Sequence, residues 1–245
     1  MKLICFPHAG GYACYYNFFD KIKFSVIDSI NYYEYPGRGR CIDTSEESNF
    51  SQRVFNAVSY VNELEVQANE YALFGHSMGA FVAYEVGRIL QKEYNLPPAV
   101  IFISGQVPPC MYETDVKNIM EGFGGNEKFI KYLGGIPDFI LRDKEVVDYY
   151  IQLTIKDFNI LKTYKPILPY PDEKLPYGVI FYGTEDIIIN PMKIQQWKKN
   201  IKHICEIIVY PGNHFYISKE FENVARIMDE WTFKINNILK MEVIE

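Results

Sequence analysis

A serine flanked by glycines is the residue in this chain best suited to act as a nucleophile. The sequence Gly75-His76-Ser77-Met78-Gly79 follows an apolar run at residues 71–74 and precedes a stretch with helical periodicity. G-x-S-x-G in that position is typical of a strained strand-to-helix turn that exposes the serine hydroxyl. A Cβ at either glycine would collide with the neighbouring strand or helix, so both must be small. We predict that Ser77 is a nucleophile; the alternative is a serine that only caps the helix.

A general base must lie beside Ser77, because a hydroxyl at its ordinary pKa is a poor nucleophile. The chain has four histidines. His76 is part of the turn and is expected to point away from Ser77, while His8 follows the first strand and His203 directly precedes a later one. His214 lies in a turn between the last apolar strand and the final helix. Its position fits the chain order serine, acid, histidine of the α/β-hydrolase triad, so His214 is the predicted base.

The acid of such a triad should lie between the serine and the histidine, at the C-terminal end of a strand. After the predicted strand at 100–104 the chain reads Gly105-Gln106 and offers no carboxylate. After the strand at 178–182 it reads Gly183-Thr184-Glu185-Asp186. We predict Asp186 as the acid, which would orient the imidazole and stabilise its charged form. Its neighbour Glu185 is the alternative.

Two backbone N–H groups are also needed to stabilise the oxyanion that forms during acyl transfer. One is expected from Met78, the residue after the nucleophile. The other should come from the loop after the first strand, Pro7-His8-Ala9-Gly10-Gly11, whose glycines let the backbone turn its amides inward. We predict the N–H of Ala9 for this role, with that of Gly10 as the alternative.

The elements that must position these residues alternate along the chain between short apolar runs and longer stretches of helical period. Helices are predicted at 50–69 and 78–93, where apolar residues recur at three- and four-residue steps. This alternation is typical of a mostly parallel central sheet flanked by helices, the α/β class. The predicted strands span residues 3–6, 30–34, 71–74, 100–104, 178–182 and 205–210.

Residues 106–171 interrupt that alternation, since they contain helical segments at 128–133 and 144–163 but no convincing strand. A segment of this length is too long for a plain loop. We predict a single α/β-hydrolase domain over 1–245 with a helical lid inserted at 106–171. Gly124-Gly125 and Gly134-Gly135-Ile136-Pro137 are the expected joints between lid helices, and the proline-rich tract 165–176 returns the chain to the sheet in extended form.

Composition excludes several classes of function. The net charge is -6 and no long basic run is present, which argues against nucleic-acid binding. No segment approaches the roughly 20 apolar residues of a membrane span, and the N-terminus lacks a signal-peptide pattern. The five cysteines show no C-x-x-C spacing, so neither a disulfide framework nor a metal site is expected. We therefore expect a cytoplasmic, monomeric protein without a metal or cofactor of its own.

A series of motifs covering nearly the whole chain resembles the stand-alone type II thioesterases that accompany non-ribosomal peptide and polyketide synthetases. The motifs are Phe6-Pro7-His8-Ala9-Gly10-Gly11, Tyr35-Pro36-Gly37-Arg38-Gly39-Arg40, Gly75-His76-Ser77-Met78-Gly79, Leu133-Gly134-Gly135-Ile136-Pro137, Asp157-Phe158 before Tyr164, Gly183-Thr184-Glu185-Asp186 and Gly212-Asn213-His214-Phe215. Two segments depart from the family pattern: Gln106-Val107 lacks the basic residues that many members carry after Gly105, and Thr154-Ile155-Lys156 stands where an arginine is common. Both departures concern substrate preference.

The resemblance implies hydrolysis of acyl thioesters held on the phosphopantetheine arm of a transiently bound acyl or peptidyl carrier protein. It also implies the triad Ser77, Asp186 and His214. A generic cytoplasmic esterase or an acyl-CoA hydrolase would use the same triad and is the first alternative. A relative that has lost catalysis and binds an acyl group or a partner protein is the second.

Basic residues could contact the phosphate of the arm or an acidic carrier. Arg38 and Arg40 allow two interpretations: contact with that phosphate, or a turn in which Arg38 pairs with a carboxylate inside the fold. Because the chain as a whole is acidic, docking would need a local patch. The lid residues that could form one are Lys117, Lys128, Lys131 and Arg142.

Overall fold

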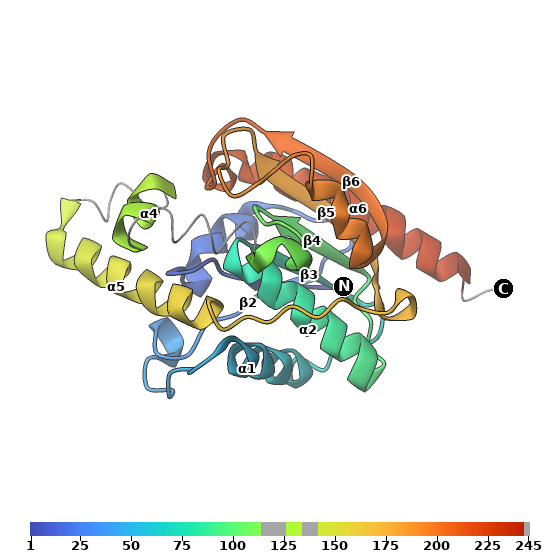
Figure 1. Cartoon of the computed structure of the whole chain (residues 1–245). Helices are drawn as coiled ribbons and strands as arrows, with labels where there is room; N and C mark the ends of the chain where they lie inside the picture. The colour runs from blue at the N-terminus through green and yellow to red at the C-terminus, as the bar shows by residue number, and fades with distance from the viewer. Residues whose placement is uncertain (114–125, 134–141, 243–245) are drawn as a thin grey trace.

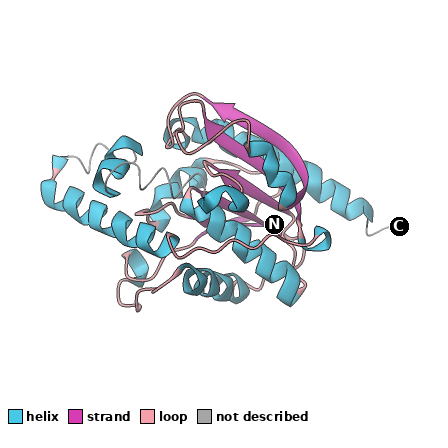
Figure 2. Cartoon of the chain, viewed as in Figure 1, coloured by secondary structure: helices cyan, strands magenta, loops and turns pink. Residues whose placement is uncertain are grey.

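The computed structural model describes residues 1–113, 126–133 and 142–242, and these contain one parallel sheet of six strands. The strand order is β2-β1-β3-β4-β5-β6, and every neighbouring pair is parallel. Figure 2 shows the strands side by side with helices on both faces. The strands are β1 (Lys2–Phe6), β2 (Ser29–Tyr32), β3 (Tyr71–His76), β4 (Val100–Ser104), β5 (Leu175–Gly183) and β6 (Ile201–Tyr210).

Both faces of the sheet are covered, which explains the continuously apolar strand sequences. In β1, Ile4 and Phe6 belong to the hydrophobic cluster under α1 (Phe50–Glu63) and α2 (Met78–Tyr94). Leu3 and Cys5 belong to a second cluster with η1 (Ala13–Lys21) and α6 (Ile217–Glu242). Alternate residues of a strand point to opposite faces, so one short strand contributes to both layers. Figure 1 shows α1 and α2 on one side of the strands and α6 on the other.

Parallel pairing brings the C-terminal ends of the strands to one edge, and this places the predicted site residues together. Phe6 at the end of β1 is in register with Gly75 of β3, and His76 is in register with Ser104 at the end of β4. The loops that follow β1, β3, β5 and β6 therefore meet at this edge.

Between β4 and β5 the chain forms η3 (Pro109–Met111), α4 (Asn126–Leu133), α5 (Lys144–Leu161) and the short η6 (Pro171–Glu173). Phe129 of α4 packs against Phe158 of α5, with ring centroids 5.6 Å apart. The predicted glycine joints of the lid, together with Lys117, lie outside the described residues. The single domain over 1–245 and the lid limits of 106–171 stay predictions.

Some strand and helix limits differ from those predicted. β6 starts at Ile201, so His203 lies within the strand. Ile201 is buried, but Lys202 and His203 after it are both exposed, so this half of the strand lacks an apolar run. β5 starts at Leu175, because its first residues pair only with β6. α1 ends at Glu63, since Glu65 adopts a left-handed φ of 51° that breaks the helix. No helix within 1–113, 126–133 and 142–242 has the length and apolarity required to cross a membrane.

Candidate active site

Ser77 occupies a sharp turn between β3 and α2. Its φ of 56° and ψ of -122° form a strained combination for a residue with a side chain. A Cβ on Gly75 would lie 2.1 Å from the carbonyl oxygen of Gly79, and one on Gly79 would lie 2.0 Å from that of Phe6. The backbone segments therefore approach as closely as only glycine permits. Ser77 also directly precedes the first residue of α2, where the helix dipole favours a developing negative charge.

His214 and Asp186 form a buried pair beside this turn. His214 Nδ1 lies 2.8 Å from Asp186 Oδ2, and neither side chain is more than 1 % exposed. Asp186 Oδ1 accepts a second hydrogen bond from the N–H of Ile188 at 3.0 Å. Glu185, the alternative acid, is exposed to solvent. The second ring nitrogen of His214, Nε2, is buried and has no hydrogen-bond partner among the described residues.

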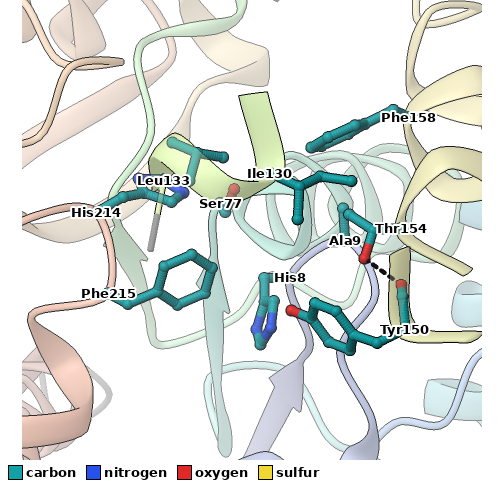
Figure 3. A pocket seen from close by; sticks show the side chains of 10 residues that line it. All are labelled: His8, Ala9, Ser77, Ile130, Leu133, Tyr150, Thr154, Phe158, His214 and Phe215. Carbon is teal, nitrogen blue, oxygen red and sulfur yellow. Dashed lines mark hydrogen bonds between the residues drawn. The ribbon is translucent and has the colours of Figure 1, made fainter. Parts of the chain in front are cut away.

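Ser77 and His214 line the same small cavity (Figure 3), whose volume is about 10 Å³. The lid helices α4 and α5 supply most of its apolar wall. The other lining residues are His8, Ala9, Ile130, Leu133, Tyr150, Thr154, Phe158 and Phe215.

A second cavity of about 250 Å³ also adjoins His214. Its lining residues are Tyr132, Leu133, Glu185, Ile187, Asn213 and His214.

The two predicted oxyanion donors lie at this site. Ala9 is buried and lines the small cavity, and Met78 is the first residue of α2, so its N–H has no partner within the helix. The N–H of Gly10 donates to Asp157 Oδ2 at 2.7 Å. This hydrogen bond occupies the alternative donor, so the geometry favours Ala9 over Gly10.

Two further histidines lie close to His214. His76 points away from the cavity, as expected, and its Nδ1 is 2.9 Å from Ser104 Oγ. His8 lines the cavity, which its sequence position did not indicate. Burial, followed by the nearby His214, lowers the pKa of His8 to about 3, and the same two causes lower the pKa of His76. Both rings are thus neutral at neutral pH.

A buried cluster of charges lies beneath the loop that carries Ala9. Arg38 makes two parallel hydrogen bonds to Asp157 of α5, at 2.6 and 2.7 Å, and Arg53 of α1 bonds the same carboxylate at 2.9 Å. Arg53 also bonds Glu47 at 2.6 Å. Burial would raise the pKa of Asp157, but the charges of Arg53 and Arg38 outweigh it and hold the pKa at about 2. Of the two interpretations of Arg38, the structure supports pairing inside the fold.

Arg53 and Asp157 had no predicted role, although the sequence carries a signal for each. Arg53 shares a helix face with Ala57 and Val61, and Asp157 shares one with Leu161. A charged residue on an apolar helix face requires a buried partner. The pattern thus indicates that such a partner exists without identifying it.

The basic residues considered for docking a carrier protein are not part of the buried charge cluster around Asp157. Arg40 is exposed and donates to the carbonyl of Tyr32 at 2.8 Å, and Lys128 and Arg142 are exposed as well. The side chain of Lys131 is outside the described part of the chain. In the described segments no three His, Cys, Asp or Glu side chains are grouped so that they could hold a metal ion.

A strand-to-helix elbow at the C-terminal edge of a parallel sheet, with helices inserted before the fifth strand, defines the α/β-hydrolase fold. Residues 1–232 match the thioesterase domain family, and the chain belongs to that family. It is therefore a hydrolase that acts on thioesters.

Several thioesterases are about a quarter identical to this chain over the residues that match. Thioesterase PikA5 of Streptomyces venezuelae is 26% identical over 231 residues, which cover 92% of this chain and 78% of PikA5. The medium-chain S-acyl fatty acid synthase thioesterase of Anas platyrhynchos is 28% identical over 229 residues, covering 88% and 85%. The crystal structure of ClbQ from the colibactin NRPS/PKS pathway has the same fold, with a TM-score of 0.79, 23% identity and coverage of 97% and 98%.

Proposed function

We propose that this protein is a stand-alone thioesterase that hydrolyses acyl thioesters on the phosphopantetheine arm of acyl or peptidyl carrier proteins in non-ribosomal peptide or polyketide synthesis. The observation that carries the proposal is the buried Asp186–His214 pair, 2.8 Å apart, beside a cavity that His214 lines together with Ser77. The Nε2 of His214 has no hydrogen-bond partner among the described residues. Membership of the thioesterase family, the likeness to thioesterase PikA5 and the NRPS/PKS pathway of ClbQ support the substrate class.

In the proposed reaction, Asp186 accepts the Nδ1 proton of His214 and fixes the tautomer that leaves Nε2 free to act as a base. Nε2 takes the proton of Ser77 as its oxygen attacks the thioester carbonyl. The oxyanion that forms accepts hydrogen bonds from the N–H groups of Ala9 and Met78. The thiolate then leaves and takes the proton held on Nε2, which makes His214 a base again. His214 next accepts a proton from a water molecule, whose oxygen attacks the acyl-enzyme and releases the acyl group from Ser77 as a carboxylic acid.

The two cavities fit the two ends of such a substrate. The small apolar cavity over Ser77 would receive the acyl group, and the larger, more polar cavity beside His214 would receive the amide-containing arm. The arm belongs to the substrate, so the enzyme needs no cofactor of its own. We further propose that the enzyme is a cytoplasmic monomer that binds its carrier transiently.

The substrate class is tested by presenting one acyl group on a holo carrier protein, on coenzyme A and as a simple oxyester. We expect the highest kcat/KM on the carrier. A preference for coenzyme A would indicate an acyl-CoA hydrolase, and a preference for the oxyester would overturn the thioesterase assignment for this site.

The nucleophile is tested by labelling with a fluorophosphonate probe. Ser77→Ala should abolish labelling and lower turnover by on the order of 10⁴-fold or more. Ser59→Ala, which removes a hydroxyl on the surface of α1, is the control and should behave as wild type. Wild-type labelling of Ser77→Ala would reject this nucleophile, and an intact wild type that does not react would favour a non-catalytic relative.

A further inference from the structure

Asp157 is a completely buried carboxylate on the lid helix α5, and its partners come from three other parts of the chain. Its Oδ2 accepts from the N–H of Gly10 and from Arg38 Nη1, both at 2.7 Å. Its Oδ1 accepts from Arg38 Nη2 at 2.6 Å and forms an ion pair with Arg53 Nη2, 2.9 Å away. Charge-assisted hydrogen bonds of this length are strong and directional. Together they fix α5 to the core at this position.

The loop that carries Ala9 is held on both sides of that residue. Tyr35 donates its hydroxyl to the carbonyl of Pro7 at 2.9 Å, Asp157 accepts the N–H of Gly10, and Arg38 Nη1 donates to the carbonyl of Gly11 at 3.1 Å. The direction of the Ala9 N–H depends on the two peptide planes that flank it. These hydrogen bonds therefore constrain the direction of the N–H from both sides, together with the bond from the Gly11 N–H to the carbonyl of His8 at 2.9 Å.

α5 also contacts this loop directly. Gly10 adopts a φ of 77°, and a Cβ there would lie 2.0 Å from Thr154 Oγ1. Figure 3 shows Ala9 next to Thr154 at the edge of the cavity. Because Thr154 and Asp157 are neighbours on one face of α5, the helix packs against the loop and bonds to it at the same point.

The same carboxylate is linked to the second oxyanion donor. Arg53, which bonds Asp157 Oδ1, also places its Nη1 3.1 Å from Met78 Sδ. The ring of Tyr35 lies against both guanidinium groups, with distances of 5.2 Å to Arg38 and 4.4 Å to Arg53. One charge cluster thus contacts Gly10 and Gly11, which follow Ala9, and the side chain of Met78.

We propose that Asp157 is a positioning residue for the oxyanion hole, acting through Gly10 and Arg38 on the N–H of Ala9 and through Arg53 on Met78. The inference rests on the proposed hydrolysis at Ser77. It also makes the lid part of the catalytic apparatus, because the carboxylate that orients the loop belongs to α5. Loss of orientation at a donor should weaken binding of the transition state more than binding of the substrate.

Asp157→Asn tests the proposal with little change in size. The amide cannot accept all three hydrogen bonds or pair with the charge of Arg53, and its N–H₂ faces guanidinium donors, so the loop loses its fixed direction. We expect kcat for thioester hydrolysis to fall roughly 10- to 100-fold with KM within about two-fold, somewhat less than removal of a whole oxyanion donor. Affinity for an alkyl trifluoromethyl ketone, which forms a tetrahedral adduct with the serine, should fall by a similar factor.

A purely structural role would give a different result, and Glu85→Gln provides the comparison. Glu85 is a buried carboxylate bonded to Tyr164 at 2.8 Å and to Arg88 at 2.9 Å. No hydrogen bond or ion pair within the described part of the chain joins it to the Ala9 loop. Its substitution should lower the midpoint of thermal unfolding while kcat and ketone affinity, measured well below that midpoint, stay near wild type. Equal losses of kcat in both variants would overturn the proposal, as would a wild-type kcat in Asp157→Asn.

Arg38→Lys serves as a second variant in case Asp157→Asn does not fold. It keeps the positive charge but cannot hold Asp157 and Gly11 at the same time. We expect the same pattern, a lower kcat with KM unchanged, and an unaltered kcat would contradict the proposal. Wild-type protein is assayed in parallel, because a wild type that neither hydrolyses thioesters nor reacts with fluorophosphonate would refute the proposed function instead.

Discussion

At the scale of single residues, adjacent carboxylates illustrate how position decides function. Asp186 and Glu185 follow the same strand, but only Asp186 turns inward to His214, and Glu185 stays in solvent. A buried acceptor at 2.8 Å can fix the imidazole tautomer, whereas an exposed carboxylate beside it cannot. The different roles of Asp186 and Glu185 can be tested by substituting each residue in turn.

Asp186→Asn should lower kcat by on the order of 10⁴-fold, because an amide stabilises the wrong tautomer of His214. Glu185→Gln is the matched comparison and should retain kcat within about two-fold. Any effect of this substitution should be on KM, because Glu185 lines the cavity proposed to receive the arm. The kcat of both variants is measured by thioester hydrolysis at saturating substrate. A loss confined to Glu185→Gln would assign the acid to Glu185 instead.

At the scale of elements, the elbow depends on close contact between β1, β3 and the start of α2. Gly79→Ala should destabilise the protein by roughly 3 kcal/mol, because its Cβ would meet the carbonyl of Phe6, which cannot move away. Gly87→Ala in the same helix is the control. Its Cβ would meet only side-chain ends, at 3.0 Å or more, so we expect stability within about 1 kcal/mol of wild type. Chemical denaturation compares them, and equal stability of the two variants would contradict this account.

Helices α4 and α5 supply much of the wall of the cavity that we propose receives the acyl group. At about 10 Å³ it holds roughly one water molecule, so short acyl groups should be preferred. Ile130→Ala enlarges it from the α4 side and should raise the ratio of kcat/KM for a hexanoyl over an acetyl thioester by on the order of ten-fold. Ile160→Ala shortens an α5 side chain that is partly buried outside the cavity and should leave the ratio unchanged. A shift in both variants would show that general loosening of the lid, not cavity volume, sets chain length.

At the scale of the whole molecule, two buried neutral histidines couple folding to pH. The pKa of His8 is lowered to about 3 and that of His76 is also lowered, both chiefly by burial, whereas an unfolded histidine titrates near 6.5. Below pH 6.5 the unfolded chain therefore binds protons that the folded chain does not. Stability is highest above pH 6.5 and falls as the pH drops from 6.5 toward 3, by up to roughly 1.4 kcal/mol per pH unit for each histidine.

Denaturation of His76→Asn at pH 7.5, 6.5 and 5.5 checks this linkage. We expect its stability to depend less steeply on pH than that of wild type, because one of the two groups is gone. His203→Asn, an exposed position on β6, should keep the wild-type slope. A wild-type slope in His76→Asn would mean that other groups cause the acid sensitivity.

Much of the fold follows from local sequence. Apolar runs separated by amphipathic stretches predicted a mostly parallel sheet, and the structure confirms it. The glycines around Ser77 predicted the elbow in the same way, because strand, turn and helix preferences act over a few residues. The early start of β6 was missed because this edge strand has two exposed polar residues near its start, Lys202 and His203, and so lacks the apolar run that marks a buried strand.

The sequence by itself determined the residue types of the site and their order along the chain, because the motifs that carry them are local. Only the tertiary structure showed that Asp186, and not Glu185, is the partner of His214. It alone also showed that the N–H of Gly10 donates to Asp157 and that Arg38 pairs with the same carboxylate. Arg38 and Asp157 are 119 positions apart in the chain. Contacts of that kind depend on strand register and on how α5 packs over the sheet edge, and no local pattern encodes either.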